Sequence, residues 1–247
     1  MLIDNVNDKW STAHRPWPLP RLPWVMEQSW NQALFIHYPI RLDVLRQLVP
    51  SQLPLDSYDG WGWIGLVAFD MENVKFRGLP AASNFPELNV RTYVTINGKP
   101  GVYFFSLDAT HLPMVTFARI LCNLPYHHAS MDNKQDGDYH LFRSYRKKDR
   151  SISLDCSYRS MSEPFLAASG SFDEWLTERY CFYTTGVKRR TVVRCDILHL
   201  PWPLQKAEAD IRENNILSGM GIQVEQVPPI LHYSKGVDVR IWPLVRV

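Results

Sequence analysis

The chain has 247 residues, of which 45% are hydrophobic, so it can bury a sizeable core and is not expected to be disordered. Its 27 basic and 25 acidic residues leave a formal charge of +2, which gives no electrostatic footprint for nucleic acid. A content of 9 Trp, 11 Tyr, 11 Phe and 18 Pro favours half-buried strands separated by turns, and therefore a β-rich fold.

The first segment in chain order is an N-terminal arm at residues 1–23. Prolines at positions 16, 18, 20 and 23 prevent a helix there and favour an extended path. No internal repeat and no linker divides the rest of the sequence. Residues 24–247 are therefore expected to form a single domain.

Strands and short helices follow the arm. Strands are expected at residues 30–38, 61–77 (a pair or one long bent strand), 89–96, 102–107, 126–160 (two or three strands), 191–198 and 232–245. Helices are expected at residues 43–48, 113–122, 172–180 and 203–218. Asn97-Gly98 lies between two apolar runs and predicts a hairpin. This pattern predicts one α+β domain, in which a few peripheral helices accompany an antiparallel sheet that is strongly curved or closed.

The most informative strand begins at Glu87. Side chains alternate between the two faces of a strand, so Glu87, Asn89, Arg91 and Tyr93 share one face. If this face points into a closed sheet, it lines a cavity with an acid, a cation and two hydrogen-bonding groups, and the buried charges need partners. If it points outward, it is an ordinary solvated face.

A second candidate segment runs from Arg119 through Pro125. Pro125 ends any helix, and in the strand that follows Tyr126 and His128 share one face while His127 lies on the other. Adjacent histidines on opposite faces cannot bind one ion, and the spacing fits no metal motif, so no metal site is predicted. No P-loop, nucleophile elbow or dinucleotide fingerprint occurs, and no cofactor is expected.

The cellular location is predicted from cysteines and hydropathy. None of the four cysteines has C-x-x-C spacing, which is typical of small core residues in a reducing compartment. Residues 1–10 carry charges and no apolar signal region, and no apolar run approaches the roughly 20 residues of a membrane helix. A cytoplasmic protein without a membrane span is expected.

Several strings carry a family resemblance. The most specific is Glu87-Leu88-Asn89-Val90-Arg91-Thr92-Tyr93-Val94. Further strings, in chain order, are Phe35-Ile36-His37-Tyr38, Leu48-Val49-Pro50, Trp63-Ile64-Gly65-Leu66-Val67, Leu124-Pro125-Tyr126, Thr177-Glu178-Arg179-Tyr180 and His199-Leu200-Pro201-Trp202-Pro203. Together they resemble the YqjF-like family, an uncharacterised family described as a domain of unknown function. That family in turn resembles the acetoacetate decarboxylase-like superfamily.

The resemblance implies a β-cone or barrel around a central cavity, where acetoacetate decarboxylase uses a lysine to form a Schiff base with a β-keto acid. It implies that Glu87 is the cavity glutamate, that Tyr126 takes the place of the Schiff-base lysine, and that His127 takes the place of its partner lysine. A Schiff base needs a primary amine, so the chain is not expected to be a Schiff-base decarboxylase. The resemblance also favours the inward orientation of the Glu87 strand.

The first functional hypothesis is a cavity that binds a small, anionic, carboxylate-like molecule. Its candidate binding residues are Glu87, Asn89, Arg91, Tyr93, Arg119, Tyr126, His128 and His37. The second is an enzyme, a lyase, isomerase or hydrolase acting on a keto or hydroxy acid, with Glu87 as general acid/base and Tyr126 stabilising an enolate-like oxygen. The third is a non-catalytic interaction protein whose cone is filled by its own side chains. The sequence is compatible with a homo-oligomer.

Overall fold

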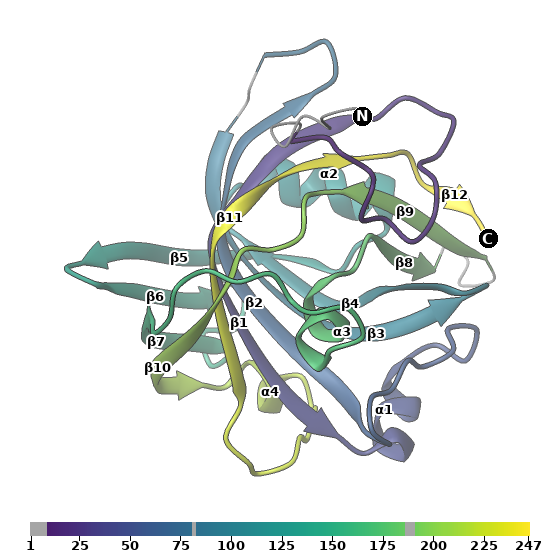
Figure 1. The fold of residues 1–247 in the computed structure, drawn as a ribbon. Helices are drawn as coiled ribbons and strands as arrows, with labels where there is room; N and C mark the ends of the chain where they lie inside the picture. The colour runs from purple at the N-terminus through teal and green to yellow at the C-terminus, as the bar shows by residue number, and fades with distance from the viewer. Residues whose placement is uncertain (1–8, 81–82, 186–190) are drawn as a thin grey trace.

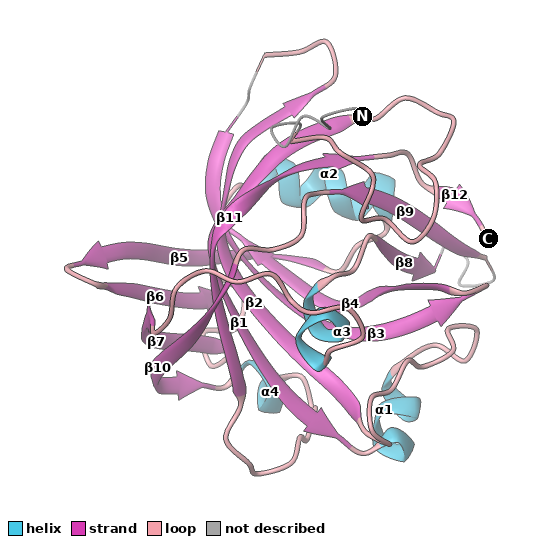
Figure 2. Ribbon diagram, viewed as in Figure 1, coloured by secondary structure: helices cyan, strands magenta, loops and turns pink. Residues whose placement is uncertain are grey.

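The computed structural model describes residues 9–80, 83–185 and 191–247 of the chain, and one 12-stranded sheet dominates it (Figure 1). The strands are β1 (Met26–Ile40), β2 (Gly62–Phe76), β3 (Ser83–Ile96), β4 (Lys99–Ala109), β5 (Tyr126–Asp136), β6 (Tyr139–Arg146), β7 (Ser153–Ser160), β8 (Cys181–Thr185), β9 (Val192–Leu198), β10 (Leu204–Asn214), β11 (Ile230–Ile241) and β12 (Val245–Arg246). The helices are α1 (Leu42–Leu48), α2 (Leu112–Cys122), α3 (Phe172–Thr177) and α4 (Ile216–Gly219). Figure 2 shows these short helices around a body made of strands.

The strand order is β12-β9-β8-β4-β3-β2-β1-β11-β10-β7-β6-β5, and two further pairings close the sheet on itself. The β4–β5 pairing closes nine strands into a barrel, and the β9–β11 pairing closes a second ring on the other side. Among the described strands, only β4–β5 and β4–β8 are parallel pairs, and α2 supplies the crossover that a parallel β4–β5 pair needs. The expected α+β fold with a closed sheet is confirmed, with a mixed sheet in place of a purely antiparallel one.

Strands β1–β4 and β11 belong to both closures, so both of their faces are buried. On β3, Leu88 and Val90 pack into one core with residues of β6 and β7. Tyr93, on the opposite face of β3, packs into a second core with residues of β8 and β9. Because this second core lies inside the ring closed by β9–β11, the face of β3 that carries Glu87 is turned toward an interior.

The Asn97-Gly98 hairpin is confirmed between β3 and β4. Both residues have positive φ, 51° and 70°, as a two-residue turn with the twist of the flanking strands requires. The predicted strand at residues 61–77 is the single long β2, and residues 126–160 form the three strands β5, β6 and β7. The predicted helices at residues 43–48, 113–122 and 172–180 are confirmed as α1, α2 and α3, with small shifts at their ends.

The predicted helix at residues 203–218 is wrong. Residues 204–214 form β10, and only the single turn α4 that follows is helical. Helix-favouring Gln, Lys, Ala and Glu residues occur throughout this stretch. Pairing to β11 at one end and to β7 along the rest outweighs their intrinsic preference, which amounts to less than about 1 kcal/mol per residue.

The N-terminal arm packs on the barrel. Between residues 9 and 25 the chain has no helix or strand, while residues 1–8 of the predicted arm lie outside the described part. The indole of Trp17 donates to Asp196 at 2.8 Å, and the guanidinium of Arg15 forms a buried ion pair with the same carboxylate. These contacts tie the arm to β9.

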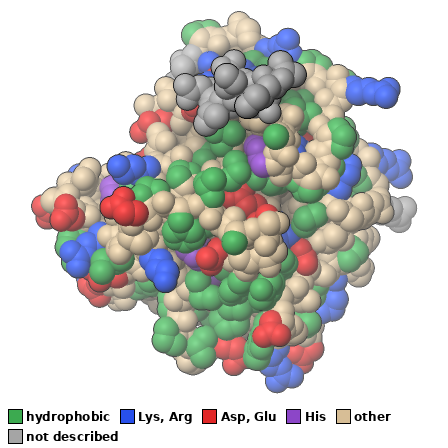
Figure 3. Space-filling view, viewed as in Figure 1, with side chains coloured by type: hydrophobic (Ala, Val, Ile, Leu, Met, Phe, Trp, Pro, Cys, Tyr) green, Lys and Arg blue, Asp and Glu red, His purple; other side chains and the backbone are tan. Residues whose placement is uncertain are grey.

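The face of the molecule in Figure 3 carries acidic and basic side chains interspersed, in keeping with the small net charge. Among the described residues, no helix combines the length and apolar character that crossing a bilayer requires.

Candidate functional site

A hydrogen bond between Glu87 and Tyr126 marks the interior. Glu87 lies on β3 opposite Phe69 of β2 and Ala109 of β4, and only 3% of its surface is exposed. The phenol of Tyr126, the first residue of β5, donates to Oε2 of Glu87 at 2.7 Å. Burial raises the pKa of the Glu87 carboxyl to about 7, although the hydrogen bond from Tyr126 acts in the opposite direction. A carboxyl of this kind can hold or release a proton near neutral pH.

Arg91 is a buried cation on the same face of β3. It is 9% exposed, and its guanidinium lies 5.6 Å from the centre of the Phe35 ring. In the described part of the chain, its Nε and Nη2 atoms have no hydrogen-bond partner and no carboxylate forms an ion pair with it. Oδ1 of Asn89, one pleat away, is also buried without a partner. Unsatisfied polar groups this close together are unusual in a native interior.

Gly65 on β2 makes room for this cation. A Cβ atom at Gly65 would lie 3.4 Å from Cγ of Arg91 and 3.1 Å from Cδ2 of His37. The His37 Nε2 atom and the Tyr93 hydroxyl are 2.8 Å apart, and Tyr93 donates its single proton to the carbonyl of Leu176. His37 is therefore the donor to Tyr93, and burial and the nearby Arg91 cation keep its pKa well below the usual value.

Two compartments open beside these groups. The polar compartment, about 50 Å³, is lined by Glu87, Asn89, Arg91 and Arg179 together with several apolar residues. The apolar compartment, about 100 Å³, is lined mostly by Met, Phe, Leu and Ile side chains, with the buried amide of Gln28 and, apart from a thiol, Glu87 and Tyr126 as its ionisable groups. Glu87 lines both, as do Trp30, Phe104 and Ile197, so the two compartments meet at the carboxyl.

His199 also lines the polar compartment, but it brings no charge. Its Nδ1 atom lies 2.7 Å from the carbonyl of Leu200, and burial lowers its pKa to about 4. Among the described residues, the permanent charges facing this compartment are therefore the two guanidiniums of Arg91 and Arg179.

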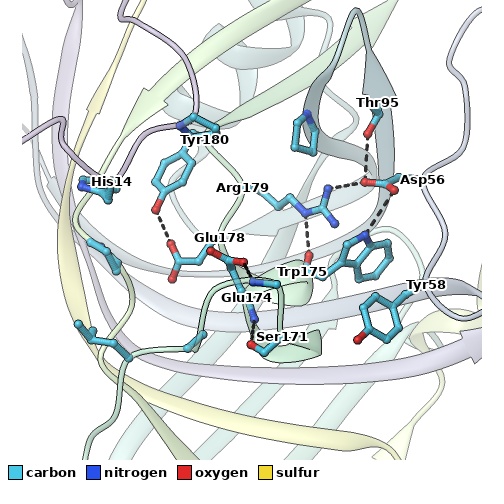
Figure 4. Close-up of a pocket in the computed structure, with 16 residues that line it drawn as sticks. His14, Asp56, Tyr58, Thr95, Ser171, Glu174, Trp175, Glu178, Arg179 and Tyr180 are labelled. Carbon is cyan, nitrogen blue, oxygen red and sulfur yellow. Dashed lines mark hydrogen bonds and ion pairs between the residues drawn. The ribbon is translucent and has the colours of Figure 1, made fainter.

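A larger outer pocket, about 550 Å³, lies on the other side of Arg179 (Figure 4). Arg179 lines both this pocket and the polar compartment, so it forms part of the wall between them. Its Nη1 donates to Asp56 at 2.6 Å, and its guanidinium lies 4.7 Å from the Tyr93 ring and 4.6 Å from the Trp175 ring. Its Nη2 is buried and has no hydrogen-bond partner among the described residues.

Acidic and aromatic side chains surround the outer pocket. Figure 4 shows Glu178 turned toward Tyr180, whose phenol donates to it at 2.6 Å. Burial raises the pKa of the Glu178 carboxyl, with the neighbouring Glu174 acting in the same direction. The outer pocket is thus lined by several carboxyl groups beside Arg179, whereas the polar compartment is lined by two guanidiniums.

Not all predicted site residues come together. The two compartments are lined by four of them, Glu87, Asn89, Arg91 and Tyr126. Two others, Tyr93 and His37, contact each other and line neither compartment. Arg119 is exposed on α2 and lines a separate groove. His128 pairs with Ala109 across the β4–β5 junction and lines none of these pockets. His127, expected beside Tyr126, has its pKa lowered to about 4 by burial and by Arg146.

The prediction of site residues missed Arg179, His199 and Trp202, all of which line the polar compartment. Each occurs in a string that carried the family resemblance, and those strings were the available signal. Within the described ranges, no group of three or more His, Cys, Asp or Glu is arranged to hold a metal ion.

Comparison with known sequences decides the family. Residues 27–238 match the model of the DUF2071 family, described as "Uncharacterized conserved protein". The chain belongs to this family. It is 47% identical over 224 residues to the "Uncharacterized protein YqjF" of Bacillus subtilis (strain 168), covering 90% of this chain and 92% of that relative. The predicted YqjF-like membership is confirmed.

Comparison with solved structures confirms the fold of this DUF2071 chain. Acetoacetate decarboxylase from Legionella pneumophila aligns with a TM-score of 0.65 at 12% identity, over 100% of this chain and 98% of that one. The enduracididine biosynthesis enzyme MppR, bound to a condensation product of pyruvate, aligns with a TM-score of 0.65 at 10% identity, over 91% and 90%. An acetoacetate decarboxylase-like enzyme from Sphingomonas wittichii RW1 gives 0.59 at 10% identity, over 95% and 97%. At these identities the likeness establishes the fold alone.

Proposed function

We propose that this chain binds a small molecule carrying a carboxylate, or a similar anion, in the polar compartment beside Arg91. The observation that carries the proposal is the Arg91 guanidinium, which is buried while its Nε and Nη2 lack partners. A buried charge is retained only with compensation, and no described side chain supplies an opposite charge to it. An anion entering the compartment would supply that charge.

The neighbouring groups suit the same ligand. Guanidinium binds carboxylate through two parallel hydrogen bonds, and Arg91 has two free nitrogens for this purpose. The Arg179 guanidinium faces the same compartment with a third unpartnered nitrogen. A volume of about 50 Å³ suits a group the size of a carboxylate, since a water molecule takes about 30 Å³ in the liquid.

One structural relative gives independent support. MppR, which shares the fold, has been solved in complex with pyruvate, a small carboxylate. At 10% identity this says nothing of the residues involved or of the place where pyruvate binds, but it shows that another protein of this fold binds a small carboxylate.

An enzymatic role is the second candidate, favoured by Glu87. A buried carboxyl with a pKa of about 7, held by a phenol at 2.7 Å, is suited to general acid/base work on a keto or hydroxy acid. The reaction would be that of a lyase, isomerase or hydrolase. The described lining of both compartments includes no lysine, which supports the view that the chain is not a Schiff-base decarboxylase.

The four free cysteines support a cytoplasmic location.

Binding is tested by following the Tm of the purified protein in the presence of pyruvate, acetoacetate and 3-hydroxybutyrate, with acetone as the uncharged control. A ligand that binds only the folded chain raises the Tm. We expect one or more acids to raise it, and acetone not to. Arg91→Gln should abolish the response, whereas Arg119→Gln, which alters an exposed arginine, should keep it. An equal response in both variants, or none to any acid, would contradict the proposal.

The enzymatic alternative has its own test. Any turnover of an acid that binds should be lost in Glu87→Gln while the Tm response to that acid remains. Turnover that survives this substitution would exclude Glu87 as the proton carrier.

A further inference from the structure

The cavity has two chemically different halves that meet at one carboxyl. The polar compartment contains both guanidiniums, whereas the apolar compartment extends from Glu87 toward α2. A molecule that occupies both must be charged at one end and apolar at the other. We propose that the ligand is a short acid whose carboxylate lies at Arg91 and whose apolar tail, three to four carbons long, fills the apolar compartment. This inference rests on the proposed anion site and specifies the rest of the molecule.

The walls of the apolar compartment argue for a hydrocarbon tail. Met26, Met71 and Met114 come from β1, β2 and α2, and Phe85 and Phe182 close the sides. Methionine thioethers adapt to irregular apolar shapes and contact other apolar groups favourably. Water has few partners in such a space, because the polar side chains that line it are Gln28, Glu87 and Tyr126 and, apart from a thiol, the rest of the lining is apolar.

The volume sets the length of the tail. An apolar cavity of about 150 Å³ in another protein accepts benzene, a six-carbon ring. By that measure the 100 Å³ of the apolar compartment accommodate roughly three or four carbons. A one-carbon tail, such as the methyl group of pyruvate, would leave most of it empty, and a six-carbon tail would overfill it.

The junction determines what lies between head and tail. With the carboxylate at Arg91 and the tail toward Met114, the middle of the ligand passes Glu87, which lines both compartments and holds the phenol of Tyr126. A carbonyl oxygen at this point can accept from the Glu87 carboxyl in its protonated form, and a hydroxyl group can also donate to the phenol oxygen of Tyr126, whose own proton goes to Glu87. An oxo or hydroxy acid therefore fits better than a simple fatty acid.

The test is a chain-length series on the wild-type protein by calorimetry, using pyruvate, 2-oxobutyrate, 2-oxopentanoate, 4-methyl-2-oxopentanoate and 2-oxooctanoate. Each buried CH₂ should tighten the Kd about four-fold. We expect this gain to continue to the four-carbon tail of 4-methyl-2-oxopentanoate and to reverse at 2-oxooctanoate. Pyruvate binding as tightly as 4-methyl-2-oxopentanoate would overturn the inference and leave the anion site intact. No binding by any acid would overturn the proposed function, and the inference with it.

Two substitutions on α2 locate the tail. Ala118 lines the apolar compartment, so Ala118→Phe should remove the advantage of the longer acids while pyruvate binds as before. Ile120, on the same helix, is 68% exposed, so Ile120→Phe should leave the whole series unchanged. An unchanged chain-length series in folded Ala118→Phe would show that the tail lies elsewhere.

Discussion

The phenol of Tyr126 reaches the carboxyl of Glu87 at 2.7 Å, although the two residues belong to β5 and β3, which do not pair with each other. They meet because β4 pairs with both strands, antiparallel to β3 and parallel to β5. The closure of the barrel at β4–β5 therefore creates the contact that marks the proposed site. Burial raises the pKa of both groups, so Tyr126 keeps its proton at neutral pH while the Glu87 carboxyl, with a pKa of about 7, can hold or release one.

The raised pKa of Glu87 should appear in the pH dependence of stability. In the folded chain the carboxyl keeps its proton up to about pH 7, while in the unfolded chain it loses it near its ordinary value of 4.5. The free energy of unfolding should therefore fall as pH rises from about 4.5 to 7, by about 3 kcal/mol. Glu87→Gln should remove this part of the fall. Urea denaturation across this pH range measures it.

A matched control is Asp70, a partly buried carboxyl on β2 that lines neither compartment. Burial raises its pKa to about 6, with a hydrogen bond from Asn133 in the opposite direction. Asp70→Asn should remove a fall of the same sign that ends near pH 6, and leave the part between pH 6 and 7 in place. If Glu87→Gln shows the wild-type slope between pH 6 and 7, the raised pKa of Glu87 is refuted.

The buried cation of Arg91 should lower the free energy of unfolding of the ligand-free protein. It is buried without an opposite charge, so Arg91→Met, which keeps the stem beside Phe35, should raise the free energy of unfolding by about 1–4 kcal/mol. Arg146 is the matched contrast, because it forms a buried ion pair with Asp108 at 2.9 Å. Arg146→Met leaves that carboxylate buried alone and should lower stability by about 3–5 kcal/mol.

Chemical denaturation at pH 7 without added acids measures both variants. Opposite signs for these two buried arginines are the expected result. A loss of stability in Arg91→Met as large as that in Arg146→Met would mean that Arg91 has a partner in the folded chain.

The alternation of side chains along β3 predicted the polar face correctly. Glu87, Asn89 and Arg91 do share a buried face, because period two survives in any strand. Whether that face pointed inward depended on the pairing of β9 with β11, which closes the ring and involves residues far apart in sequence. The alternation of side chains along one strand holds no information on whether the sheet closes. The family resemblance supplied the prediction that the polar face points inward.

Residues outside regular alternation escaped prediction. Arg179 follows α3 in a short connection, and His199 follows β9, so neither lies in a strand whose faces could be assigned. Arg119 was a candidate because its segment, which runs through Pro125, resembles the segment that carries the lysines of acetoacetate decarboxylase, but its helix turns it to solvent. The β10 segment was mistaken for a helix because its residues favour one locally and only its partners β7 and β11 make it a strand.

Gly65 should be needed for the position of Arg91. Gly65→Ala would place a methyl group 3.1 Å from Cδ2 of His37, whose ring must then shift slightly, and in van der Waals contact with Cγ of Arg91 at 3.4 Å. We expect a loss of about 1–3 kcal/mol of stability and a weaker Tm response to carboxylic acids.

Gly101→Ala is the control for Gly65, because its Cβ would lie 2.6 Å from the Sγ atom of Cys181, away from Arg91. It should also lower stability, yet keep the Tm response to acids. If the response is equal in the two variants, Gly65 has no particular role in the site.

The ion pair between Arg179 and Asp56 should hold the wall between the outer pocket and the polar compartment. Their side chains are 3% and 19% exposed, and Asp56 also accepts from Thr95 and Trp175. Asp56→Asn leaves the guanidinium without an opposite charge and should cost about 3 kcal/mol in the free energy of unfolding. It should also tighten acid binding, since Arg179 would then face the ligand unpaired.

The exposed Arg41–Asp43 pair is the control, and Asp43→Asn should change neither the free energy of unfolding nor acid binding appreciably. Weaker acid binding in folded Asp56→Asn would mean that Asp56 positions Arg179 for the ligand and does not compete with it.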